Sequence, residues 1–130
     1  GDVEVVKPPT VAAQEETSRV FDEAIDAVVD AYHKLLDAGV PAEDARYLLP
    51  NAAETKIVIT MNIRELLHFL SLRCCNRAQW EIRELANRML ELVRPTAPYI
   101  FMDAGAPCVR GACPEGKMTC GNPYPKVVRE

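Results

Sequence analysis

The sequence has no excess of positive charge and no long apolar run, and these two absences exclude several kinds of partner. The formal net charge is −4, whereas proteins that bind nucleic acid or anionic membranes usually present a basic face. No apolar stretch approaches the roughly 18 residues that a membrane-spanning helix needs. We therefore expect no nucleic acid and no membrane among the partners of this chain.

A secretory signal is also missing, and the cysteines do not form an even set. The chain contains 5 cysteines, and an odd number without a signal peptide argues against a disulfide scaffold and for a reducing compartment. The first residue is Gly1 rather than Met, which fits a processed product or a piece of a longer protein. We predict a cytoplasmic location.

Apolar and charged residues are present in the proportions of a folded protein. Hydrophobic residues make up 48% of the 130 positions and charged residues 26%, which suits one domain or a large part of one. Beyond about residue 103 the chain becomes rich in Gly, Pro and Cys. We predict a packed region over residues 1–103 and an irregular tail over residues 104–130.

The first third of the chain has the pattern of helices. We predict a helix from about Thr10, a plausible N-cap; apolar residues recur at helical spacing over residues 20–36, and Gly39 ends the helix. Pro41 suits the first position of a second, short helix, which must stop near Pro50.

The middle of the chain predicts one strand and two further helices. Residues 55–61 are β-branched and partly alternating, which favours a strand. Asn62, followed by Glu65, is typical of a helix N-cap, and Asn76 with Gln79 repeats this arrangement before a helix that stops at Pro95. The expected fold class is α/β in the α+β sense, mostly helical, with one strand that joins a sheet completed by residues outside this chain or by a partner.

Polar residues around the strand-to-helix junction are the candidates for a site. Asn62, Arg64 and His68 lie at or just after a helix start, whose free N–H groups suit a phosphate or an electron-rich ring. Arg73 lies at the far end of the same helix among apolar neighbours, where a guanidinium can bind a carboxylate or phosphate in bidentate fashion. Each also has a structural explanation: Asn62 as a simple cap, His68 as an ordinary histidine, and Arg73 as the partner of Glu81 or Glu84.

The order of four short segments is more specific than any single residue. Together they resemble the flavin-dependent thymidylate synthases, which show A-R-x-x-L-P, N-x-R, L-R and A-Q-x-E-I-R runs in this order. The resemblance covers roughly residues 8–121, and the tail segment Cys113–Lys117 is similar to the ending of some members. The four segments are Ala45–Pro50, Asn62–Leu66, Phe69–Arg73 and Ala78–Arg83.

The resemblance implies roles for particular residues. Arg46 and Arg73 match arginines that bind dUMP, and Arg73 also matches the catalytic arginine thought to favour the N3-ionised uracil. For FAD, the resemblance implies contacts from a set made up of Asn62, Ile63, Arg64 and His68. The family often has Asn where this chain has His68, and often has His where it has Arg77.

The reaction implied is the reductive methylation of dUMP to dTMP. Methylenetetrahydrofolate would supply the carbon, and NADPH would reduce FAD. The family's upstream Arg-His-Arg motif is absent from these residues, so residues 1–103 resemble the C-terminal half of the domain. The resemblance implies a homotetramer, or association with a chain that supplies the missing N-terminal half.

Other functions remain open at this point. The chain could be a non-catalytic remnant or assembly module of the family. It could also be a small metal-binding protein that uses Cys108, Cys113 and Cys120, although their spacing is not that of a zinc knuckle or a ferredoxin, and we predict no metal. A nucleophilic role for Cys74, which directly follows Arg73, is the least favoured alternative.

Overall fold

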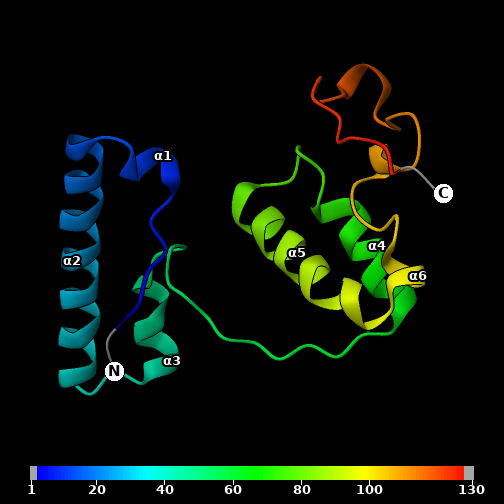
Figure 1. Cartoon of the computed structure of the whole chain (residues 1–130). Coiled ribbons are helices and arrows are strands. Elements are labelled where there is room, and N and C mark those ends of the chain that lie inside the picture. Colours follow the sequence, from blue (N-terminus) through cyan, green and yellow to red (C-terminus); the bar gives the residue numbers. More distant parts are fainter. Residues whose placement is uncertain (1–2, 128–130) are drawn as a thin grey trace. The chain divides into compact units, whose positions relative to one another are not determined.

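The computed structural model describes residues 3–127, and the chain divides into two compact units between Val58 and Ile59. Figure 1 shows the helices of each unit, with an extended segment between them. None of the helices in residues 3–127 is long and apolar enough to cross a membrane.

The first unit contains two short helices and one long helix. They are α1 (Pro9–Ala12), α2 (Glu15–Asp37) and α3 (Ala42–Ala45), and a 3-10 turn over Arg46–Leu48 continues α3. The single helix predicted from Thr10 is wrong at its start, because Gln14 is extended, with φ −129° and ψ 137°. The hydroxyl of Thr17 donates to the carbonyl of Val11 at 2.7 Å and so holds the two helices across this break.

The predicted end of the long helix is confirmed. Gly39 follows α2 with φ +82°, a left-handed conformation that glycine adopts without a Cβ penalty. Pro41 is the N-cap of α3 rather than its first helical residue. The N-terminal lead-in is tied to this unit as well, because Val5 forms an antiparallel bridge with Ala53.

The segment 55–61 does not form a strand within residues 3–127, and its pairing with a sheet completed by other residues or by a partner stays a prediction. The segment has no regular hydrogen-bonded partner, and Ile57, Val58 and Ile59 are 70%, 100% and 60% exposed. β-Branched composition favours a strand only where a neighbouring strand supplies the ladder. The described residues are therefore mostly helical, and the α+β class is not confirmed.

The second unit is built on two helices that pack together. They are α4 (Ile63–Arg73) and α5 (Trp80–Val93), and they are followed by a 3-10 turn, Arg94–Thr96, and by α6 (Pro98–Phe101). Two further 3-10 turns, Pro107–Val109 and Gly116–Met118, lie in the tail. The core consists of Leu70, Cys74, Ala86, Leu90, Phe101, Ala104 and Ala106.

The chain approaches α5 closely just after α6. Gly105 has φ +123°, and a Cβ at this position would lie 3.4 Å from Cδ2 of Leu90. Glycine therefore supplies both the backbone conformation and the space that this turn requires. The buried Ala104 and Ala106 on either side show that the beginning of the tail belongs to the core.

The predicted helix starts in this unit are right in one case and wrong in the other. Oδ1 of Asn62 accepts a hydrogen bond from the backbone N–H of Glu65 at 2.9 Å, so Asn62 caps α4 as expected. For α5 the cap is Gln79, whose Oε1 accepts from the N–H groups of Glu81 and Ile82. Asn76 is not the cap, because its amide donates instead to the carbonyl of Asn122 in the tail at 2.8 Å.

Candidate functional site

The start of α4 gathers three of the predicted site residues. Asn62, Ile63 and Arg64 occupy consecutive positions there, and all three are exposed. The Asn62 oxygen is used for capping, while the first-turn N–H groups have no partner inside the helix. His68 lies one turn beyond Arg64, on the same side of the helix and exposed.

These groups are chemically suited to a flavin. The Asn62 amide, the Arg64 guanidinium and the open N–H groups of the first turn are all hydrogen-bond donors. The positive end of the helix dipole adds to the attraction for negative charge. Together they could hold a phosphate or the electron-rich edge of an isoalloxazine ring.

Arg73 lies at the opposite end of α4. The helix has 11 residues, so Arg73 is about 16 Å along the axis from the residues at the helix start. The chain thus places the predicted flavin residues and the predicted catalytic arginine at the two ends of one element. Arg46 lies in the first unit, at the start of the 3-10 turn that follows α3, with its side chain exposed.

A cavity of about 250 Å³ lies beside Arg73. One wall comes from the end of α4 and the turn into α5, including Ser71 and Arg77, and the other comes from the tail, including Glu115 and Tyr124. Arg73 is exposed, and its side chain takes part in no ion pair or hydrogen bond within residues 3–127. Its guanidinium is therefore free to bind an anionic or planar group.

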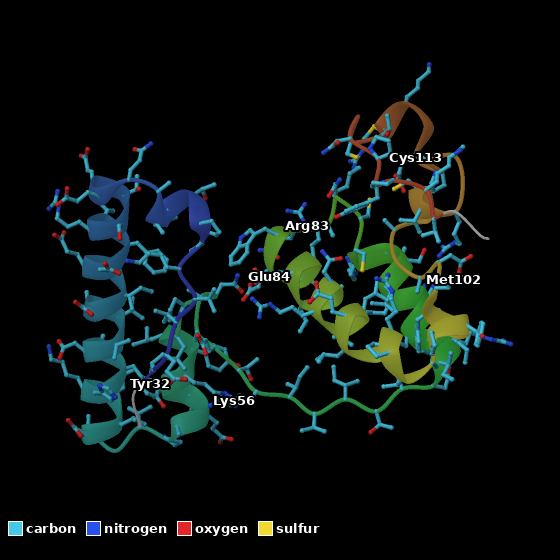
Figure 2. The ribbon with its side chains drawn as sticks, viewed as in Figure 1. Tyr32, Lys56, Arg83, Glu84, Met102 and Cys113 are labelled. Atoms are coloured by element: carbon cyan, nitrogen blue, oxygen red, sulfur yellow. The ribbon has the colours of Figure 1, made fainter. Side chains whose placement is uncertain are left out.

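Arg73 does not form the structural ion pair with Glu81 or Glu84 that was the alternative explanation for it, at least within residues 3–127. Glu84 pairs with Arg88, four residues along α5, at 2.7 Å, and Glu81 forms no salt bridge in the described part of the chain. Figure 2 labels Glu84 and its neighbour Arg83 on α5. Arg83 donates instead to the carbonyl of Asn76 at 2.9 Å and so braces the turn before α5.

The tail wall of the cavity is a feature that the sequence pattern did not reveal. Arg77 donates to the carbonyl of Met118, and Asn76 donates to that of Asn122. Both acceptors are backbone carbonyls, which every residue carries, so residue identity in the tail gives no signal for these contacts. The tail is thus held against the turn between α4 and α5.

Cys74 is not suited to nucleophilic catalysis. It is 2% exposed, and burial raises the pKa of its thiol, while the nearby Arg94 partly opposes this effect. The thiol therefore stays protonated near neutral pH, and the thiolate is the reactive form. The cation that acts on Cys74 is Arg94 rather than Arg73, the residue just before it in the chain.

The cysteines do not assemble a metal site in the described part of the chain. All 5 cysteines are free thiols. No group of three or more His, Cys, Asp or Glu side chains within residues 3–127 is placed to hold a metal ion. The metal-binding alternative built on Cys108, Cys113 and Cys120 therefore has no support in this geometry.

The sequence of this chain matches the model of a known protein family. A family model described as "Thymidylate synthase complementing protein" matches residues 1–99, most of the 130-residue chain. The chain belongs to this family.

Curated relatives carry a more particular name. The chain is similar to a protein of Geobacter sulfurreducens named "Flavin-dependent thymidylate synthase", with 63% identity over 116 residues, covering 89% of this chain and 50% of the relative. Proteins with the same name from Clostridium tetani (45% identity, 88% of this chain, 52% of the relative) and Nitratidesulfovibrio vulgaris (48%, 92% and 53%) are also similar. The chain spans about half the length of these relatives.

Proposed function

We propose that this chain forms the C-terminal half of a flavin-dependent thymidylate synthase that converts dUMP to dTMP. The family membership and the names of the relatives support this proposal. The observation that carries it is the Arg73 guanidinium, which is free of protein partners beside a cavity of about 250 Å³. The carbon would come from methylenetetrahydrofolate, and NADPH would be the reductant.

Arg73 is the residue that would act on the pyrimidine. Uracil N3 is a weak acid, and a permanent cation beside it favours the ionised, more nucleophilic ring. Arginine suits this role because it stays protonated and presents a planar pair of donors. Arg46, on the first unit, would bind the phosphate or sugar of dUMP.

The start of α4 would bind the cofactor. Bound FAD would supply the hydride that completes the methyl group. Asn62 and Arg64 would donate hydrogen bonds to it, Ile63 would contact it between them, and His68 would donate one more. Each of these side chains is exposed at or near the helix start, so a ligand can reach them.

The remainder of the enzyme would come from other residues. The exposed segment Ile57–Ile59 has apolar side chains, and its backbone groups have no hydrogen-bond partner within residues 3–127, as expected of a strand that awaits a neighbouring strand. We propose that this segment joins a sheet supplied by the N-terminal half or by a partner subunit, in a homotetramer located in the cytoplasm. The division of the chain into a half-domain over residues 1–103 and a tail over residues 104–130 is part of the same proposal.

The test is an assay of the complete protein. It should bind FAD, showing the yellow flavin absorption, and should form dTMP only when dUMP, methylenetetrahydrofolate and NADPH are all present. A protein that binds neither FAD nor dUMP would contradict the proposal and would indicate a non-catalytic remnant or assembly module.

Asn62 offers a prediction that separates capping from cofactor binding. Asn62→Ala should lower the free energy of unfolding by about 1 kcal/mol, because the Glu65 N–H loses its acceptor, and should also weaken FAD binding. Asn62→Asp keeps a capping oxygen but has no amide donor, so stability should be retained while FAD affinity falls. Urea denaturation and FAD titration measure the two effects, and equal FAD affinity in Asn62→Asp and the wild type would show that Asn62 only caps the helix.

A further inference from the structure

Thiols line both walls of the cavity beside Arg73. Cys75 lies on the wall formed by the end of α4 and the turn that follows it, and Cys108, Cys113 and Cys120 lie on the tail wall. All four are free thiols, and the proposed methylation reaction uses none of them. A concentration of thiols next to the residue that would bind substrate needs a separate explanation.

Two of these cysteines flank a reversal of the tail. The reversal is the 3-10 turn Gly116–Met118, closed by a hydrogen bond from the Met118 N–H to the Glu115 carbonyl at 2.8 Å. Gly116 has φ +52°, which bends the chain sharply. Cys113 precedes the turn and Cys120 follows it, and both line the same cavity; Figure 2 labels Cys113 on this tail segment.

The two cysteines differ in access to solvent. Cys120 is exposed, and its sulfur accepts a hydrogen bond from the Asn122 N–H at 3.4 Å. Cys113 is partly covered. A small oxidant can therefore reach Cys120 first, with Cys113 across the turn as the second thiol.

The tail wall itself is held without covalent bonds. The Met118 carbonyl, which accepts from Arg77, lies between Cys113 and Cys120 along the chain. A link between the two sulfurs would tighten the loop that carries this carbonyl. It would thereby change the wall that faces Arg73.

We propose that Cys113 and Cys120 are a redox-active dithiol, oxidised to a disulfide by low-molecular-weight disulfides, and that this disulfide weakens dUMP binding at Arg73. The pairing follows from the turn and the shared cavity alone. The effect on dUMP rests on the proposed function.

The chemistry is a two-step thiol–disulfide exchange. Cys120, as its thiolate, attacks one sulfur of the small disulfide; one small thiolate leaves and takes up a proton, and a mixed disulfide remains on Cys120. Cys113 then loses its proton to solvent and attacks the Cys120 sulfur, which releases the second small thiolate to be protonated in turn. The protein gives up two electrons and two protons, and the small disulfide becomes two thiols.

The other cysteines that line the cavity are less suited to form a disulfide with Cys113 or Cys120. The Cys108 sulfur accepts a hydrogen bond from the Tyr124 N–H at 3.4 Å and lies under the end of the tail. Cys75 lies on the opposite wall, just beyond α4. A disulfide requires Cα atoms within about 7 Å, and a chain reversal like the one between Cys113 and Cys120 is a turn that can bring two such atoms together.

Peptide mapping of the complete protein tests the pairing. The protein is treated with glutathione disulfide or with a reducing agent, the remaining thiols are alkylated, and trypsin is added without reduction. Because Lys117 lies between the two cysteines, cleavage separates them into peptides 111–117 and 118–126. These peptides should be joined only in the oxidised sample.

Binding measurements test the consequence. Oxidation should weaken dUMP binding by about tenfold, a change readily resolved by calorimetry. The double variant Cys113→Ser, Cys120→Ser should bind dUMP as the reduced wild type does and should not respond to the oxidant. Cys108→Ser is the matched control, because it removes a thiol of the same wall and should leave both the link and the response intact.

Three results would overturn the proposal. They are the absence of a link after oxidation, a link through Cys75 or Cys108 instead, and retention of zinc by the thiols of the purified protein. An oxidised protein with unchanged dUMP affinity would disprove the regulatory effect. If the reduced protein bound no dUMP at all, the proposed function would fail. The peptide map would still show whether Cys113 and Cys120 form a disulfide.

Discussion

Replacing Arg73 with alanine in the complete protein is expected to abolish dTMP formation and weaken dUMP binding, while FAD binding largely survives. Arg73 has no protein partner in the described residues, so its removal leaves no group of this chain uncompensated. The loss should therefore appear in substrate binding and not in folding. Losing a charge-assisted bidentate contact costs about 2 kcal/mol or more, which corresponds to about thirtyfold in dUMP affinity.

Arg73→Lys should also be strongly impaired. Lysine keeps the charge, but its single ammonium group cannot present two parallel donors to a planar ring. A variant with near-normal dUMP binding and a low turnover rate would indicate that the guanidinium geometry matters chiefly for ionising the ring. Steady-state kinetics with separate dUMP titrations measure the two contributions.

Arg88→Ala is the matched control for these variants. Arg88 is an exposed arginine of the same unit, paired only with Glu84 on the surface of α5, and such pairs contribute little to stability. Its replacement should leave dUMP binding, FAD binding and activity close to wild type. Near-normal dTMP formation by Arg73→Ala would contradict the central assignment of this arginine.

Local signals predicted the helical parts of the fold well. The cap at Asn62 and the stop at Gly39 were predictable because each depends on the chemistry of one residue and its immediate neighbours. The start of α5 was not, because Asn76 and Gln79 both suit a cap. Only the tertiary bond from Asn76 to Asn122 decides between them.

Features that depend on distant residues could not be settled from local composition. Residues 55–61 have strand composition, but a strand exists only where another segment supplies hydrogen-bond partners, and within residues 3–127 only the Val5–Ala53 bridge is found. The tail wall beside Arg73 is held through the carbonyls of Met118 and Asn122. Backbone acceptors leave no trace in composition or spacing, so the cavity had no signal in the sequence.

Family resemblance identified the candidate site residues, but it could not show their arrangement. Asn62 and Arg73 lie at opposite ends of α4, about 16 Å apart along its axis. A sequence motif gives the order of such residues along the chain. The distance between them along the helix axis follows from the rise of about 1.5 Å per residue.

The largest effect on stability is expected from Leu70→Ala. Leu70 is fully buried, at 0% exposure, in the middle of α4, and it belongs to the core cluster with Ala86, Leu90 and Phe101. Truncation removes apolar contacts and leaves a cavity that the neighbouring helices fill only in part. Such changes typically cost about 2 to 5 kcal/mol, a large fraction of the stability of a domain of this size.

Leu72→Ala provides the matched control, because Leu72 lies on the same helix but is 51% exposed. The same chemical change at that position should lower the free energy of unfolding by less than about 1 kcal/mol, since little apolar surface is buried there. Chemical denaturation of both variants, in the complete protein and under reducing conditions, measures the difference. An equal decrease in the free energy of unfolding in the two variants would mean that α4 does not pack through Leu70. The core cluster described for this unit would then be wrong.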